Sequence, residues 1–152
     1  MSVEDKLKEL GIELPTPPKP VAAYVPVVQT GNLCFVSGQI PIKEGRILAT
    51  GKCPSPCNPE TASKGAMICA INILAQLRAH LGSLDRIKKI VRINGYVQSD
   101  NGFYKQPEVL NGASDFLVEV FGEIGRHTRT AYGVYELPLN ATVELDAIVE
   151  VE

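Results

Sequence analysis

The chain of 152 residues is predicted to form one α+β domain, a two-layer sandwich with two helices on one face of a mixed or antiparallel β-sheet. Two stretches, residues 58–82 and the segment after Pro107, repeat apolar residues at helical spacing. Residues 142–151 alternate apolar and charged side chains, as a half-buried strand does. β-Branched runs between these stretches complete the order β-β-α-β-α-β-β after an N-terminal arm.

The first 20 residues differ in composition from the rest. Val3, Leu7 and Leu10 predict a short amphipathic helix over residues 3–10, which Gly11 ends. The prolines of residues 15–20 predict an extended connector, because proline fixes φ and lacks an N–H donor. We therefore divide the chain into an N-terminal helix with a Pro-rich arm, residues 1–20, and a domain over residues 21–152.

The next elements have local signals of their own. Residues 21–29 suit an edge strand or an extended arm because Pro26 interrupts them, and residues 33–38 are typical of a buried strand. Residues 43–45 predict a hairpin turn that leads into a returning strand over residues 46–50. The pair Asn58-Pro59 begins a helix that Gly82 ends.

The second half predicts a strand, a helix and two final strands. The strand over residues 87–97 has Ile90 on its mixed face and a buried face made of Ile87, Val91, Ile93 and Val97. A helix opened by Pro107 ends near Gly122 or Gly125. Strands over residues 130–136 and 142–151 follow, joined around residues 138–141.

Composition excludes several classes of function. The net charge is −2, and without a basic stripe nucleic acid is a poor partner, because that affinity grows with the number of neutralised phosphates. The apolar stretch over residues 65–75 is too short to span a bilayer, and the charged N-terminus does not resemble a signal peptide. We expect a cytoplasmic protein with reduced thiols and no membrane partner.

Cys53 and Cys57 form a CxxxC pair, which is half of a zinc site. No second pair exists, and His80 and His127 lack metal-motif spacing to it. We therefore predict no metal and an exposed or redox-labile loop.

The final strand leaves a mixed face of apolar and charged residues, Glu144, Asp146, Ile148 and Glu150. Because such a face is seldom left bare, it indicates a surface for self-association.

Three segments resemble one family. They are Tyr24-Val25 with the VSGQIP run at 36–41, Asn111 in the second long helix, and Arg129-Thr130 with the ELP and VELDAI runs at 136–138 and 143–148. This pattern resembles the Rid family of reactive intermediate imine deaminases, also called the YjgF or L-PSP endoribonuclease family. The resemblance implies a chorismate-mutase-like fold and a homotrimer, in which the sheets line a central barrel and three clefts lie between subunits.

The resemblance also implies a reaction, the hydrolysis of 2-imino or enamino acids to 2-keto acids and ammonia without a cofactor. Arg129 matches the arginine that binds the substrate carboxylate, a role that suits the planar guanidinium fork. Glu144 matches the acidic residue that activates or orients water, for which a raised carboxyl pKa is useful.

Four further residues match the family's ligand contacts. Tyr24 corresponds to a tyrosine that closes the cleft from the neighbouring subunit, and Asn111 to a helix asparagine that touches ligand. Ser37 and Gly38 correspond to a strand end where backbone N–H groups approach the ligand, which glycine permits.

The chain departs from the family pattern at several positions. Ala131 replaces a cysteine, Gly133 a glutamate and Ala23 a proline, and the Cys53–Cys57 insertion is long. These changes indicate a divergent branch.

If residues 138–141 formed a tight hairpin turn, Arg129 would lie about 20 Å along the strand from the residue opposite Glu144. A shared site therefore predicts that residues 134–140 form a wide loop that brings the two side chains opposite one another.

Two other functions stay open at this point. A non-catalytic binder of small carboxylates would use the same arginine. A single-strand endoribonuclease fits less well, because the chain lacks a recognisable His-His or His-Lys arrangement and a basic groove.

Overall fold

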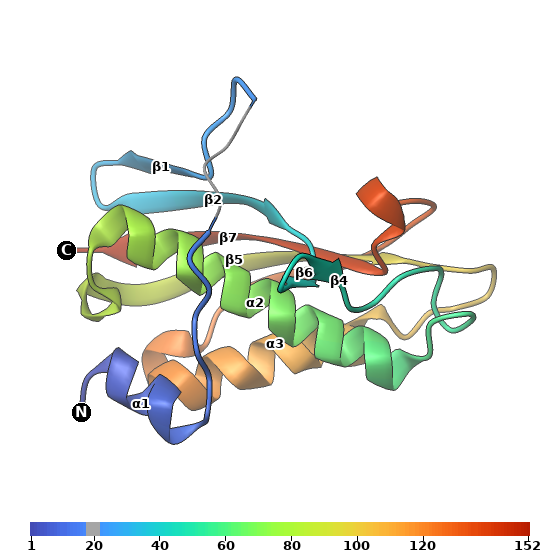
Figure 1. Cartoon of the computed structure of the whole chain (residues 1–152), viewed down its shortest axis with the longest axis horizontal. Coiled ribbons are helices and arrows are strands. Elements are labelled where there is room, and N and C mark those ends of the chain that lie inside the picture. Colours follow the sequence, from blue (N-terminus) through green and yellow to red (C-terminus); the bar gives the residue numbers. More distant parts are fainter. Residues whose placement is uncertain (18–21) are drawn as a thin grey trace.

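The computed structural model describes residues 1–17 and 22–152. Two layers make up the fold: a five-stranded sheet, and two long helices that cover one of its faces (Figure 1). The predicted α+β sandwich with two helices on one face of a mixed sheet is confirmed. Residues 18–20 of the predicted Pro-rich connector, and the predicted boundary between residues 20 and 21, lie outside the described residues.

The strands lie in the order β1-β2-β7-β5-β6. Within the described part of the chain, β5 and β6 pair in parallel, and the other neighbouring strands of this sheet are antiparallel. The strands β3 and β4 form a separate two-stranded hairpin, which confirms the predicted turn at residues 43–45. The bounds are β1 Val27–Thr30, β2 Leu33–Gln39, β3 Ile42–Lys43, β4 Arg46–Ile47, β5 Ile87–Gln98, β6 Thr128–Val134 and β7 Val143–Val151.

The two long helices are α2 (Pro59–Leu81) and α3 (Gln106–Phe121). Asn58 caps α2 by accepting a hydrogen bond from the Thr61 N–H at 2.8 Å, and Gly82 follows its last turn at φ 83°, as the sequence predicts. Their apolar sides meet the buried side of the sheet, where β7 contributes every second residue from Val143 to Val151.

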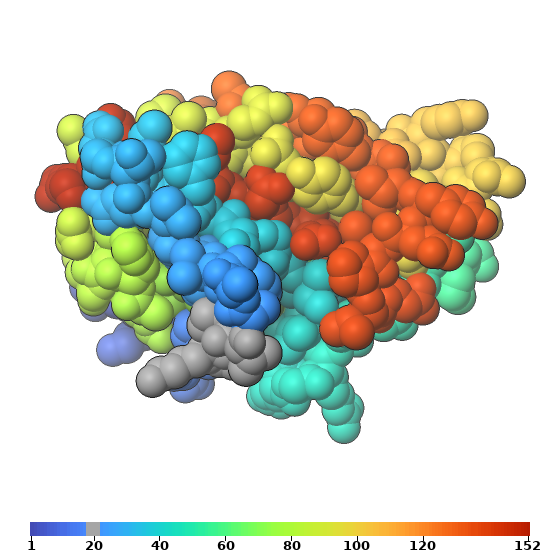
Figure 2. All heavy atoms as spheres, turned by 90° about the horizontal axis from the view of Figure 1, so that it is seen from above, coloured from blue at the N-terminus to red at the C-terminus, as the bar shows by residue number. Residues whose placement is uncertain are grey.

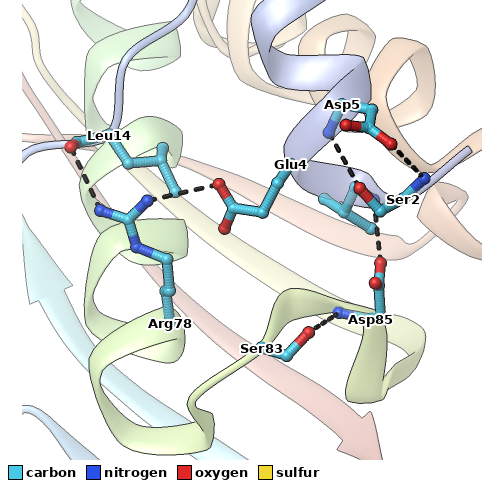
Figure 3. Close-up of polar contacts among 8 residues, drawn as sticks. Ser2, Glu4, Asp5, Leu14, Arg78, Ser83 and Asp85 are labelled. Atoms are coloured by element: carbon cyan, nitrogen blue, oxygen red, sulfur yellow. Dashed lines mark hydrogen bonds and ion pairs between the residues drawn. The ribbon is translucent and has the colours of Figure 1, made fainter.

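The N-terminal helix α1 (Val3–Glu9) packs against the helix layer rather than extending away from it. Leu7 is buried, and the Val3 N–H donates to Asp85 Oδ1 at 2.8 Å (Figure 3). Arg78 of α2 contacts both Glu4 and the Leu14 carbonyl oxygen. Residues 1–14 are therefore tied to the domain by apolar and polar contacts.

One predicted strand face is wrong. Ile90 is fully buried and Val91 is only half-buried, the reverse of the expectation for residues 87–97. The register of β5 against β7 shifts between Ile87 and Lys89 and again between Ile90 and Arg92. Each irregularity adds a residue to one strand and so moves the following side chains to the other face.

The final two strands are not neighbours. β5 lies between β6 and β7, so the chain leaves β6, crosses the end of β5 and returns as β7 on its other side. The short 3-10 helix Pro138–Asn140 lies within this crossing. This order decides where the residues of the candidate site lie.

Candidate functional site

Arg129 lies on the helix-facing side of the edge strand β6. Its neighbour across the parallel pair is Ile93, which is buried beneath the helices. The Arg129 Nη1 atom donates to Asn111 Oδ1 at 2.9 Å and to Ser114 Oγ at 3.1 Å, both on α3. The structure thus brings Arg129 and Asn111, two of the predicted site residues, into direct contact.

These two bonds use both hydrogens of the Nη1 atom. Among the described residues, no hydrogen bond or ion pair engages the Nε or Nη2 atoms of Arg129. The Nε–H and one Nη2–H point in parallel, which is the geometry that meets the two oxygens of a carboxylate. A lysine could not bind α3 with one nitrogen atom and a carboxylate with two others.

Glu144 lies on the opposite, open face of the sheet. It is opposite Tyr96 of β5, and both side chains alternate with buried residues. Figure 2 views this face, with β7 (red) between β2 (cyan) and β5 (yellow). Burial raises the pKa of the Glu144 carboxyl, and the negative charge of Asp146 raises it further.

Gly38 lies directly beneath the Glu144 carboxylate. A Cβ atom at residue 38 would lie 2.2 Å from Glu144 Oε2. The register of β2 against β7 shifts between Val36 and Gln39, so Gly38 belongs to a bulge at this point. The structure therefore brings Gly38 and Glu144, two of the predicted site residues, next to one another.

A polar network flanks Glu144 on the open face. Asp146 accepts hydrogen bonds from Asn94 Nδ2 at 2.7 Å and from the Tyr96 hydroxyl at 2.9 Å. Burial and the Asp146 carboxylate raise the pKa of Tyr96 to about 12. The Tyr96 ring stacks on that of Tyr132 with centroids 5.3 Å apart. These contacts hold Asp146 in place and keep its negative charge near Glu144.

Ser37 connects the sheet to the segment that carries Tyr24. Its N–H donates to the Pro26 carbonyl oxygen at 2.9 Å, and its hydroxyl donates to the Val25 carbonyl oxygen at 2.9 Å. The Ser37 N–H is therefore engaged within the chain. Tyr24 is 64% exposed, so its ring is available to another molecule.

Arg129 and Glu144 do not meet within one chain. Arg129 is paired across the sheet with Ile93 of β5, which is paired with Ala147 of β7. Glu144 lies three residues before Ala147 on β7. Two strand spacings and three residues separate their backbones by about 14 Å, and the side chains leave opposite faces. The predicted wide loop that brings them opposite one another is wrong, because it assumed that β6 and β7 were neighbours.

Sequence reasoning missed Ser114 as a member of the site. Ser114 is one helical turn from Asn111, so both face β6 from α3. That spacing was the available signal, but the direction of this face depends on the packing of α3. His127 contacts Ser114 Oγ through its Nε2 atom at 2.8 Å.

The cysteine pair lies away from these residues and is buried. Cys53 is wholly inaccessible and Cys57 is 5% exposed, whereas residues 54–56 between them are exposed, as the predicted exposed loop requires. The Cys53 N–H donates to Gln98 and its carbonyl oxygen accepts from Asp100, which attaches the loop to the end of β5. Burial raises the pKa of Cys53 to about 11, and the described residues show no three His, Cys, Asp or Glu side chains grouped to hold a metal.

The fold and the sequence together define the class of protein. Residues 4–151 match the family described as "YjgF/chorismate mutase-like, putative endoribonuclease", and the chain belongs to this family. The family assignment made from the sequence is confirmed, and so is the chorismate-mutase-like fold.

Particular relatives cover nearly the whole chain. Protein TCP17 from Trypanosoma cruzi is 42% identical over 149 residues, which are 97% of this chain and 93% of that protein. The 2-iminobutanoate/2-iminopropanoate deaminase of Dermatophagoides farinae is 30% identical, over 93% of this chain and 95% of that protein.

A crystal structure is also similar along the whole chain. The protein Atu1372 of unknown function from Agrobacterium tumefaciens shares 46% identity and a TM-score of 0.92, over 99% of this chain and 92% of that one. Within residues 1–17 and 22–152, no helix has both the length and the apolarity needed to cross a membrane.

Proposed function

We propose that this chain hydrolyses 2-imino and enamino acids to 2-keto acids and ammonia, in clefts between the subunits of a homotrimer. The observation that carries the proposal is the state of the Arg129 guanidinium. Its Nη1 atom donates to two side chains of α3, and among the described residues its Nε and Nη2 atoms have no hydrogen-bond partner. A carboxylate is the anion that this planar fork fits with two parallel hydrogen bonds. Family membership and the deaminase relative support the same substrate class.

The two main residues must come from different copies of the chain. Arg129 and Glu144 leave opposite faces of one sheet, so one subunit cannot enclose a small substrate with both. In the proposed trimer, the open faces line a central barrel, and Arg129 with Asn111 of one copy faces Glu144, Gly38 and Ser37 of the next. The exposed Tyr24 ring closes the cleft.

Glu144 moves the protons of the reaction. The substrate reacts as the iminium, with its nitrogen already protonated from solvent, and the Glu144 carboxylate takes a proton from water as the water oxygen bonds to the imine carbon and the C=N bond becomes single. The carboxyl group then donates its proton to the amine, and as the C–N bond breaks the hydroxyl proton passes to the Glu144 carboxylate, which releases ammonia and the keto acid and then returns this proton to solvent. A raised pKa suits a group that must both accept and return a proton near neutral pH. The reaction needs neither a metal nor an organic cofactor.

The test is a coupled assay in which a pyridoxal-phosphate dehydratase acts on serine or threonine with and without the protein. We expect faster release of the keto acid. Arg129→Ala should lower kcat/KM by about a hundredfold, since a charged hydrogen bond is worth about 1.5–3 kcal/mol. Arg126→Ala is the matched control, because Arg126 is exposed and pairs with Glu123. No acceleration by the wild-type protein would refute the catalytic proposal.

Mixing two inactive variants tests whether the site lies between copies. In a trimer reassembled from equal amounts of Arg129→Ala and Glu144→Gln chains, about one quarter of the clefts combine an intact Arg129 with an intact Glu144. Activity should therefore return to about a quarter of the wild-type value. A mixture as inactive as its parents would show that no cleft combines Arg129 of one copy with Glu144 of another, which would refute the shared site.

The second candidate is a non-catalytic binder of 2-keto acids. It is favoured by Ala131 and Gly133, which remove a thiol and a carboxylate from the strand that carries Arg129. Calorimetry with 2-ketobutyrate separates the two functions, because a binder would show Arg129-dependent heat without turnover in the coupled assay. Cytoplasmic location and the division of the chain at residue 20 stay predictions.

A further inference from the structure

A continuous row of hydrogen bonds leads away from Arg129 on the side opposite its open fork. Arg129 Nη1 lies 3.1 Å from Ser114 Oγ, and Ser114 Oγ lies 2.8 Å from His127 Nε2. His127 Nδ1 lies 2.6 Å from the Gly125 carbonyl oxygen. The row joins β6, α3 and the short 3-10 helix Gly122–Gly125.

The direction of each bond follows from its two ends. A carbonyl oxygen only accepts, so His127 Nδ1 carries the hydrogen that bonds Gly125. In a neutral imidazole the Nε2 atom is then an acceptor, and the Ser114 hydroxyl donates to it. The Ser114 oxygen keeps its lone pairs for Arg129 Nη1, which has only hydrogens to offer. Every hydrogen in the row has a partner when His127 is neutral.

We propose that Ser114 and His127 are positioning residues for the Arg129 carboxylate site, and that proton uptake by His127 weakens carboxylate binding there. This inference rests on the proposed function and adds its regulation by pH. Ser114 and Asn111 together hold Nη1 and so fix which edge of the guanidinium stays free for a ligand. A side chain fixed before binding loses less conformational freedom when the ligand arrives.

Protonation of His127 disrupts the row. The Nε2 atom becomes a donor, so the Ser114 oxygen faces two donors and its own hydroxyl hydrogen loses its acceptor. A second positive charge also appears one serine away from Arg129. The neutral form is favoured in the native protein, because burial and the Arg129 charge lower the pKa of His127.

Other charged groups lie near His127. A cavity of about 500 Å³ brings His127 together with Lys89 of β5, Glu150 of β7 and Arg126, which pairs with Glu123. On the α3 side, the described contact of the ring is the Ser114 hydroxyl. A substitution at residue 127 leaves these groups unchanged. Comparing variants at that residue therefore isolates the contribution of the imidazole to the pH dependence of binding.

The Ser114 variants test the positioning role. Ser114→Ala should raise the Kd for 2-ketobutyrate and the KM of the coupled assay about tenfold, because Nη1 loses one acceptor, while kcat changes little. Ser114→Thr retains the hydroxyl and should restore most of the affinity. An unchanged Kd in Ser114→Ala, or an equal loss in both variants, would overturn the positioning role.

The His127 variant tests the pH dependence. His127→Gln keeps an acceptor near the Nε2 position but cannot take a proton in this range. Between about pH 7 and pH 4.5, a range that extends below the ordinary histidine value of 6.5 because the pKa of His127 is lowered, the wild-type Kd should rise severalfold, although the ligand carboxyl stays ionised, and the His127→Gln value should stay flat. His80→Gln is the matched control, since His80 bonds Gln29 on another strand and should leave the rise intact. A rise that survives in His127→Gln would overturn the proposal.

A ligand-free measurement separates this inference from the proposed function. Nitrogen-15 NMR of the imidazoles should show His127 as the Nδ1–H tautomer, and the Arg129 Nε–H signal should shift with the His127 midpoint. If that coupling is seen and wild-type protein binds no carboxylate, the proposed function fails while the row of bonds is upheld. If carboxylates bind through Arg129 without this coupling, the proposed function stands and this inference fails.

Discussion

Gly112→Ala tests the close contact between α2 and α3, which holds Asn111 and Ser114 in place. A Cβ atom at residue 112 would lie 2.1 Å from the Ser63 carbonyl oxygen and 2.8 Å from its carbonyl carbon. Carbon and oxygen atoms normally approach to about 3.3 Å, so the helices would have to separate by about 1 Å. No rotamer change relieves this clash, because the nearest atom belongs to the backbone.

Two opposing effects decide the magnitude. Alanine is favoured over glycine within a helix by about 1 kcal/mol. Overpacking costs about 1–3 kcal/mol or more, and contact with a rigid backbone belongs at the upper end. We expect a net loss of about 2 kcal/mol in the free energy of unfolding, which lowers Tm by about 4–8 °C in a chain of this size.

Differential scanning calorimetry and urea titration measure this change. The double variant Ser63→Ala, Gly112→Ala is the control, since it removes the Ser63 hydroxyl but leaves the clashing carbonyl oxygen, and should stay as unstable as the single variant. A Gly112→Ala protein with unchanged or higher Tm would show that the two helices pack less closely than described.

Three further predictions follow from other contacts. Gly38→Ala displaces only the flexible tip of Glu144, so steady-state kinetics should show kcat/KM reduced about tenfold with Tm nearly unchanged; a large drop in Tm would contradict this. Glu144→Gln should raise Tm near neutral pH, because a carboxyl whose pKa is raised on folding destabilises the native state once it is ionised, and the gain should vanish below its ordinary value of 4.5; thermal unfolding across pH tests the sign. Asp85→Ala removes the acceptor of the Val3 N–H, so hydrogen exchange should accelerate in α1 and remain unchanged in β5 and β7.

Local chemistry predicted the helices and most of the strands. Asn58, Pro59 and Gly82 mark the ends of α2 through capping and backbone preferences that act over a few residues. The alternation in β7 predicted its buried face, because every residue of β7 from Val143 to Ile148 has its own partner on β5 and the irregularities add no residue to β7. Within β5, bulges moved Ile90 into the core, and nothing in its own residues signals them.

The residues of the candidate site were proposed one by one from the sequence, whereas their arrangement in space could not be predicted from it. Arg129, Glu144 and Gly38 follow from the family resemblance and from chemistry. Their separation onto two faces depends on β5 entering the sheet between the last two strands, which is a long-range pairing. Ser114 was not predicted as a site residue. Its contact with Arg129 depends on which face of α3 is turned toward β6, and tertiary packing sets that orientation.

Because the four cysteines are buried, their rates of reaction with a thiol reagent report local unfolding of the protein. Cys34, Cys53, Cys57 and Cys69 are free thiols, and all are enclosed by the native packing. An alkylating reagent needs an accessible thiolate, so each site can react only after the surrounding structure separates. Mass spectrometry of labelled peptides would then rank the loop of Cys53, strand β2 and helix α2 by their free energies of local unfolding.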